Sequence, residues 1–425
     1  MPYRQSASRR LLSNAAAATA FLGMGAFAVA VPTAPAAAQK KEKAPKAEYS
    51  KEFIAAYQAF EATRKAETPD VAAQQAALSP LLAVTASPDE KLAAGQAALN
   101  VGTATKDMQL QLRGAKMMLD SGKLPPESAG QVNFVAGQLS YNLEDFAGAR
   151  NYVQAAMDAG FENKDAPTII TESYFREGDY AGGLKHLGDL VAARRAAGQP
   201  IQEDWVKRAV SIAYQNKLND EALKWSLMYA KEFPNQTSWG DAIAIAINSN
   251  QFDKPAMLDI LRLARRTDTL RTGNMYLEYA EAADARKLPQ EVASLLDAGT
   301  AAGTISPDTA IVQEWRKQAA TRIAADKKDL PSLISDANSS GAKLVTVMAA
   351  ADALLSYGRG AEAEAMYAKA LPLAGANAPT VLTRMGIAQI DQGKYGEAET
   401  TFQRVQGARQ AIANLWALYA TQQAS

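Results

Sequence analysis

The chain has 425 residues, 48% of them hydrophobic, and its 45 Lys and Arg residues balance 45 Asp and Glu residues. This length and composition suffice for a large packed core, and the balanced charge argues against a nucleic-acid partner or an anionic membrane surface. Cysteine is absent, which excludes disulfides and a cysteine-linked lipid anchor.

Residues 1–38 have the pattern of a secretory signal peptide. Three arginines, the last two at Arg9 and Arg10, precede an uncharged stretch at 11–31, and a small-x-small cleavage pattern follows at 36–38. An uncleaved membrane anchor is the alternative, although the Ala, Gly and Thr content makes this stretch a weak transmembrane helix. The adjacent arginines resemble a twin-arginine signal, so Sec and twin-arginine export both stay open. We expect a soluble periplasmic protein that is not a lipoprotein and has no stable membrane insertion after cleavage.

The rest of the chain is predicted to be helical after a short leader. Residues 39–50 are charged and poor in apolar residues, which predicts a flexible leader. Beyond them, apolar residues recur at spacings of three and four between Gly, Pro, Asn or Asp, which predicts paired helices of about 12 to 16 residues. We expect divergent helical hairpins at 51–125 and a repeat array at 126–425, with a degenerate unit near 305–340. The last helix, at 411–422, is predicted to cap the array, with a homodimer interface as its alternative role.

A unit that recurs about every 34 to 37 residues is the strongest feature of the chain. Such a period predicts an all-α, quasi-one-dimensional solenoid. In the unit at 214–222 the turn is predicted to be one residue short. The repeats can be registered on a small residue early in each second helix, where the two helices of a hairpin cross closely: Ala149, Gly183, Ala222, Val292, Ala363 and Ala398.

These units resemble the tetratricopeptide repeat (TPR) family over roughly residues 130–420. The resemblance implies a right-handed superhelical solenoid of helical hairpins (an α-α superhelix). It also implies protein–protein interaction without catalysis or a cofactor, and with the signal peptide it implies an exported bacterial scaffold or adaptor of the cell envelope. The residues that match best are Gly137 with Asp145-Phe146, Tyr174 with Gly178-Asp179-Tyr180, and Gly386 with Gly393 and Tyr395.

The concave groove of such a solenoid is the first candidate binding site. First helices line that face, and their outward residues are not needed for the core, so they can bind an extended segment of another envelope protein. The alternatives are a glycan or peptidoglycan-binding module that uses aromatic stacking, or an accessory of an envelope polysaccharide enzyme. A competing interpretation of single aromatics such as Phe175 is that they seal the junction between repeats. The predicted groove residues are Gln138, Tyr141, Asn142, Glu172, Phe175, Arg176, Trp205, Arg208, Gln215 and Asn216.

A cluster of arginines is the second candidate site, for an anionic partner. It lies at the end of one predicted helix and in the turn that follows. The alternative role is a solvated helix C-terminus, where cations are favoured by the helix dipole. The cluster consists of Arg262, Arg265, Arg266 and Arg271.

Catalytic and metal-binding patterns are not found. The single histidine, His186, cannot build a histidine-rich zinc site without cysteine. Glu172-Ser173 is similar to the acid motif of lytic transglycosylases, but it precedes Gly178 by the normal spacing of a repeat turn. No phosphate-binding loop, HExxH pair or calcium loop occurs. We therefore predict no catalytic residue, cofactor or metal.

Overall fold

The computed structural model describes residues 47–65 and 70–424, and within these residues all the regular elements are helices. The predicted signal peptide and residues 39–46 of the predicted leader lie outside the described residues. By its contacts, the chain divides into two compact units whose boundary falls between His186 and Leu187, inside one helix. Each unit is described by itself.

Unit 1 is a stack of helical hairpins. It consists of α2 (Lys51–Arg64), α3 (Val71–Ala83), α4 (Pro88–Thr105), α5 (Met108–Asp120), α6 (Pro126–Asn142), α7 (Phe146–Asp158), α8 (Ala166–Glu177) and the first part of α9 (Tyr180–Ala196). One buried cluster joins Leu99 and Leu112 of α4 and α5 to Val132 and Leu139 of α6. The core therefore continues through residue 125, where the sequence predicted a change from divergent to regular hairpins.

Unit 2 contains the rest of α9 and twelve further α-helices, with one short 3-10 segment. Its helices are α10 (Glu203–Gln215), α11 (Asn219–Glu232), α12 (Gln236–Ser249), α13 (Lys254–Arg266), α14 (Gly273–Ala283), α15 (Pro289–Ala301), α16 (Ala310–Asn338), α17 (Leu344–Ser356), α18 (Gly360–Ala370), α19 (Ala378–Ile390), α20 (Tyr395–Gln403), η2 (Gly407–Arg409) and α21 (Gln410–Gln423).

One turn geometry recurs between the two helices of six hairpins. In each, one residue adopts a left-handed backbone conformation, and the next N–H donates to the carbonyl five residues earlier, as from Asp179 to Tyr174 at 2.9 Å. This is the hydrogen bond of a Schellman motif, which ends one helix and re-aims the chain into the next. The left-handed residues are Lys106, Glu144, Gly178, Lys217, Gly358 and Gly393.

The turn at 214–222 has this same geometry, so the prediction that it is one residue short was wrong. Lys217 occupies the left-handed position with a φ of 58°, and the Leu218 N–H donates to the Ala213 carbonyl at 2.9 Å. Ala222 follows Lys217 at the same interval at which Gly183 follows Gly178. A lysine in a position that favours glycine hid the match.

The small residues used to register the repeats are buried, as predicted. Close approach of neighbouring helices explains the glycines near them: a Cβ at Gly386 would lie 2.6 Å from the Phe402 ring, and one at Gly137 would lie 2.5 Å from Val153 Cγ2. The backbones of α4 and α5 also approach closely, because a Cβ at Gly114 would lie 2.5 Å from the Leu99 nitrogen. The registered residues therefore mark true helix crossings.

The end of the predicted flexible leader is bound to unit 1. The Glu48 N–H donates to Asp89 Oδ2 at 3.0 Å, and the Ser50 N–H and hydroxyl both donate to Glu90 Oε1 at 2.7 Å. Glu90 also forms a capping box with Ser87 at the start of α4. Burial raises the pKa of Glu90, but hydrogen bonds from Ser50, Ser87 and Ala86 outweigh it and lower the pKa to about 2.

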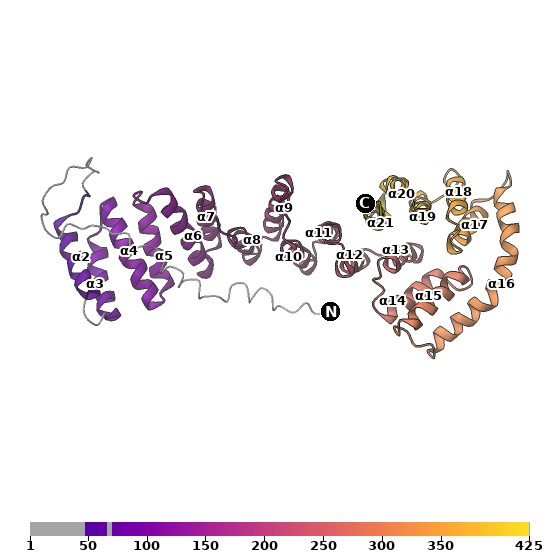
Figure 1. The fold of residues 1–425 in the computed structure, drawn as a ribbon, viewed down its shortest axis with the longest axis horizontal. Helices are drawn as coiled ribbons and strands as arrows, with labels where there is room; N and C mark the ends of the chain where they lie inside the picture. The colour runs from indigo at the N-terminus through magenta and orange to yellow at the C-terminus, as the bar shows by residue number, and fades with distance from the viewer. Residues whose placement is uncertain (1–46, 66–69, 425) are drawn as a thin grey trace. The chain divides into compact units, whose positions relative to one another are not determined.

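A single helix, α16, replaces the degenerate unit expected near 305–340 (Figure 1). It runs for 29 residues and contains Pro331 without a break. Only Val312, Ala319, Leu330 and Ala337 are buried along it, and none of residues 320–329 is. The middle of α16 therefore spans the distance between α15 and α17 with few core contacts of its own.

Unit 2 closes on itself. Each helix from α11 to α21 contacts the next, and α21 then contacts α11, α12 and α13, while α19 contacts α13. We call the line where α21 meets α11–α13 the seam. The segment at 411–422 was predicted to cap the array, but it does more, because its apolar face packs against helices near the start of the same unit. The apolar face of α21 is therefore packed against helices of the same chain.

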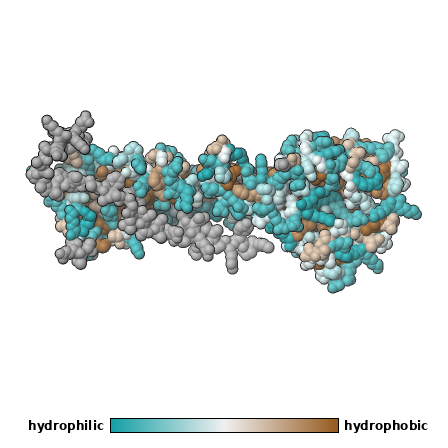
Figure 2. All heavy atoms as spheres, viewed as in Figure 1, coloured by the Kyte–Doolittle hydropathy of each residue, from teal (hydrophilic) through white to brown (hydrophobic). Residues whose placement is uncertain are grey.

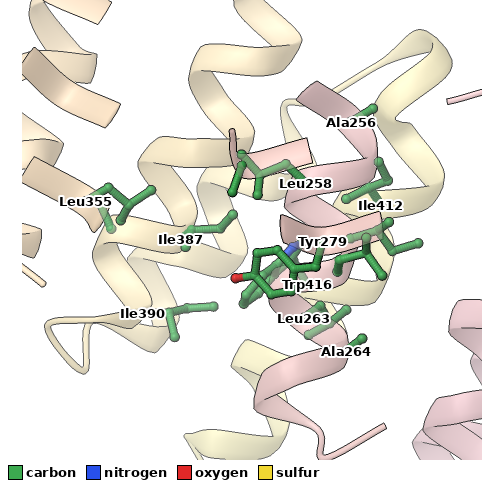
Figure 3. Close-up of a cluster of buried hydrophobic side chains, with 14 of the residues drawn as sticks. Ala256, Leu258, Leu263, Ala264, Tyr279, Leu355, Ile387, Ile390, Ile412 and Trp416 are labelled. Atoms are coloured by element: carbon green, nitrogen blue, oxygen red, sulfur yellow. The ribbon is translucent and has the colours of Figure 1, made fainter. Parts of the chain in front are cut away.

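Helix α13 lies at the centre of this closed circuit. Its residues from Leu258 to Ala264 are all buried. Figure 3 shows side chains from α13, α14, α19 and α21 gathered in one cluster, among them Leu258, Tyr279, Ile387 and Trp416. On the outside, the face seen in Figure 2 is mostly hydrophilic over the described residues, with hydrophobic residues in small separate groups.

Candidate binding sites

The predicted groove residues divide between the two units and between surface and core. Three of them are core residues: Tyr141, Phe175 and Trp205 are only 8%, 6% and 6% exposed. The Phe175 ring fills the space over Gly183, where a Cβ would lie 2.3 Å from it. For these three the groove prediction was wrong, because the first helices bury their aromatic rings at repeat junctions.

In unit 1, the exposed predicted residues lie at the ends of α6 and α8, which contact each other. Asn142 and Arg176 are exposed, whereas Gln138 and Glu172 are half-buried. The Arg176 guanidinium lies 6.0 Å from the centre of the Phe146 ring and 3.6 Å from Glu144, and its side chain is 57% exposed. This surface combines an amide, a cation and the edge of an aromatic cluster.

In unit 2, the other four predicted residues lie on α10 or, for Asn216, at its C-cap. Gln215 is exposed and Arg208 is half-buried, as is Asn216. The Gln215 amide donates to Ser211 Oγ at 3.1 Å, and the Asn216 amide donates to the Ile212 carbonyl at 2.8 Å. These two amides therefore already bind α10 itself.

The predicted anion-binding arginines bind groups of the same chain. Arg262 is 6% exposed and lies in the core, so its assignment to a surface patch was wrong. Arg265 donates to Ser294 Oγ at 2.8 Å, Arg266 pairs with Asp391, and Arg271 donates to the Gln236 carbonyl. Arg262 points inward because its neighbours on α13 are apolar. A cluster of arginines in the sequence does not show which way each side chain points.

Unit 2 contains a buried charge network that was not predicted from the sequence. Asp259, 0% exposed, accepts from Arg262 Nη1 at 3.0 Å, Arg384 Nε at 3.3 Å and Arg409 Nη1 at 2.6 Å. Its backbone carbonyl also accepts from Trp416 Nε1 at 3.0 Å. The Asp259 carboxylate thus joins α13 to α19 and η2, and its backbone carbonyl joins α13 to α21.

Two further carboxylates balance these arginines. Glu291 takes a bidentate contact from Arg262, at 2.8 and 2.7 Å, and accepts the Tyr279 hydroxyl at 2.8 Å. Asp352 accepts from Arg384 Nη1 at 2.7 Å. We call these six charged residues the buried charge network: Asp259, Glu291 and Asp352 with Arg262, Arg384 and Arg409.

Electrostatics keep the network ionised. Burial by itself raises the pKa of Asp259, but the Arg384, Arg262 and Arg409 guanidiniums hold that pKa below its ordinary value. Burial likewise raises the pKa of Glu291, which Arg262 and the Tyr279 hydroxyl lower. The sequence does contain one indication of this network, because Asp259 and Arg384 are charged residues that each interrupt an apolar helical run.

A cleft of about 470 Å³ opens beside the seam. It is lined by residues of α11, α12 and the segment from Gly407 to Leu415, which lie far apart in the sequence. Its walls are mixed, with aliphatic side chains such as Leu223, side-chain amides such as Asn414, and one carboxylate, Asp220. We call it the seam cleft.

The residues considered for catalysis have ordinary helical positions. Glu172 lies on α8, half-buried. His186 Nδ1 lies 2.9 Å from Thr171 Oγ1, which donates its own hydrogen to the Pro167 carbonyl and so accepts from the ring. The part of the chain that the structure describes holds no group of three His, Cys, Asp or Glu side chains placed for a metal ion. Across residues 47–65 and 70–424, no helix combines the length and apolar character needed to cross a membrane.

Similarity to known proteins is confined to solved structures. A chain of the Naa15/Naa10 complex bound to HypK-THB aligns with 85% of this chain and 58% of its own, at 13% identity and a TM-score of 0.38. A chain of the APC/C hetero-tetramer Cut9–Hcn1 aligns with 86% of this chain and 66% of its own, at 12% identity and a TM-score of 0.22. This chain thus spans less than two thirds of the length of either. No protein-family model matches the sequence, and no curated protein matches it.

The class of the protein follows from its own geometry. Six hairpins share one turn, and in five of them a small buried residue lies five residues after the left-handed position. The protein is an all-α superhelical repeat of TPR-like helical hairpins.

Proposed function

We propose that the protein is a non-catalytic scaffold that binds other proteins, and that it does so in the bacterial cell envelope. Arrays of helical hairpins commonly present extended binding surfaces. The observation that carries the proposal is the exposed surface of α6 and α8, where Asn142 and Arg176 lie outside the core on adjacent first helices. A partner segment with carbonyl and carboxylate groups suits an amide beside a guanidinium.

The ion pairs of the buried carboxylates support a non-catalytic role. Asp259 and Glu291 are held by arginines at hydrogen-bonding distance, so neither is available as a general acid. The seam cleft is lined by a single carboxylate, whereas glycoside hydrolysis uses two.

The envelope location rests on the first 38 residues of the sequence. Fractionation of cells that express the full chain tests it, together with the mass of the mature N-terminus. A periplasmic product that begins near Gln39 is expected. A cytoplasmic product with its N-terminus intact would contradict the location without affecting the binding proposal.

Aromatic stacking on a glycan is not favoured as a second function. The three aromatics of the predicted groove, Tyr141, Phe175 and Trp205, are buried. Tyr214 is 45% exposed, and its hydroxyl accepts from Asn248. A single exposed ring is a weak platform for an extended sugar chain.

A capture experiment with a matched control tests the binding surface. The full chain is tagged, cross-linked in cells and purified as wild type, Arg176→Glu and Lys65→Glu. Both residues are exposed cations of unit 1 that contact a glutamate, at 3.6 Å and 3.5 Å. We expect Arg176→Glu to lose partners that wild type and Lys65→Glu retain. Equal recovery from all three forms would show that α6 and α8 are not the binding surface.

A further inference from the structure

We propose that the seam cleft is a second binding site, and that it takes a short, extended, uncharged peptide segment with aliphatic side chains. The proposal shares with the proposed function only the class of partner, since the cleft lies in unit 2 and the surface of α6 and α8 lies in unit 1. Each can fail without the other.

Closure of unit 2 builds this site. One wall comes from α11 and α12, and the other comes from η2 and the first turns of α21. The opposite walls come together where α21 packs against α11–α13 and where Arg409 and Trp416 bind Asp259. A concave site at a junction of elements, with a volume of about 470 Å³, has the size and setting usual for ligand sites.

The floor of the cleft selects for aliphatic groups. Leu223 and Leu227 of α11 are partly buried, and they line the cleft together with the buried Leu415 of α21. The lining contains no aromatic residue, so the cleft offers no stacking surface for a sugar or a base. Burial of aliphatic side chains from a ligand is what such a floor can stabilise.

The polar groups of the cleft match a peptide backbone. Gln410 and Asn414 are exposed at the edge, and neither side chain forms a hydrogen bond with another described residue. Each amide can donate and accept at once, which is the pattern that a peptide group presents. Asp220 and Lys224 add opposite charges, so the lining favours neither an anion nor a cation. Together these features favour a neutral backbone over a phosphate or a carboxylate.

Saturation-transfer NMR with the full chain tests the proposal. The probe is the blocked peptide Ac-Ser-Leu-Ser-Leu-Ser-NH2. The comparison ligands are the same peptide with Asp in place of Leu and a chitin trisaccharide. We expect transfer to the leucine methyl groups from the wild-type chain and at least fivefold less transfer to either comparison ligand. Transfer to the sugar alone, equal transfer to both peptides, or no transfer to the leucine peptide would each overturn the proposal.

Three variants test whether the peptide binds in the seam cleft. Asn414→Leu removes one amide, Ala408→Trp fills the cleft, and Gln313→Leu makes the same kind of amide replacement on the exposed face of α16. These positions are exposed, so thermal unfolding should be close to that of wild type. We expect the first two to weaken the leucine peptide signal at least fivefold and Gln313→Leu to leave it unchanged. Unchanged binding by both cleft variants would overturn the assignment.

The two proposals are separated by one cross-comparison. Arg176→Glu should bind the leucine peptide like wild type, and Asn414→Leu should recover partners of the unit 1 surface like wild type. Loss of peptide binding in Arg176→Glu would show that the peptide does not bind at the seam cleft.

Discussion

Replacement of Asp259 by asparagine tests whether the buried charge network holds unit 2 closed. Asparagine keeps the size of the side chain and removes one negative charge. The network then contains three arginines and two carboxylates, so one positive charge is left unbalanced in the core. Removal of one partner from a buried ion pair usually costs about 3–5 kcal/mol, because the remaining charge is buried without compensation.

The contacts of Asp259 place this variant well within that range. Asp259 receives three guanidinium contacts, at 2.6, 3.0 and 3.3 Å, and asparagine would turn an N–H group toward at least one of them. We expect Asp259→Asn to lower, by about 4 kcal/mol, the free energy of the opening that exposes the amides of α13 and α21 to exchange. The matched control is Glu281→Gln, which makes the same chemical change in an exposed pair with Lys254 at 2.7 Å and should cost less than about 1 kcal/mol.

Hydrogen exchange measured by mass spectrometry reports unit 2 separately from unit 1. Amides of α13 and α21 should exchange faster in Asp259→Asn, and those of α4 and α5 should not change. A second replacement, Arg409→Gln, restores the charge balance, so the double variant should lose less than the sum of the single variants. Additive losses, or equal effects of Asp259→Asn and Glu281→Gln, would refute the argument that unbalanced charge causes the loss.

Three more predictions concern turns, helix crossings and pH. Glu90→Gln should destabilise unit 1 by about 2–3 kcal/mol at neutral pH, since Glu90 accepts several hydrogen bonds as a buried anion. Because its pKa is lowered to about 2 in the folded chain, wild type should lose this stability as the pH falls from about 4.5 toward 2, and the variant should not; urea titrations across that range measure it. Gly114→Ala should cost about 2–3 kcal/mol because the new Cβ meets the α4 backbone, whereas Gly188→Ala has room and should gain about 0.5–1 kcal/mol; thermal unfolding compares them. Lys217→Gly should raise the stability of the α10–α11 hairpin by about 0.5–1 kcal/mol, as its φ of 58° costs a side-chain-bearing residue; unchanged or faster exchange of α10 amides would contradict this.

Local features of the fold were predictable because they depend on neighbouring residues. The helical spacing of apolar residues, the Gly178-Asp179-Tyr180 turn and the small residue at Ala398 are all set by contacts within one hairpin. The wrong prediction at Lys217 also concerns contacts within one hairpin. Only the backbone angle shows that this lysine occupies the left-handed position where glycine is expected.

Contacts between distant segments were not predictable from periodicity. A helical pattern tells which face of α13 is apolar, but Asp259 meets Arg384 and Arg409 across 125 and 150 residues. The same limit explains the wrong assignment of Arg262, whose partners lie on other helices. It also explains α16, where a weak repeat signature concealed one long helix in place of a hairpin.

Closure of unit 2 fixes the number of its repeats. An open array can gain or lose a hairpin by duplication or deletion, because each unit contacts only its neighbours. In unit 2 an added or missing hairpin would displace α21 from α11–α13 and separate Arg409 from Asp259. Natural variation in repeat number should therefore be confined to unit 1, and engineered insertion of a hairpin should be tolerated there and not between α11 and α21.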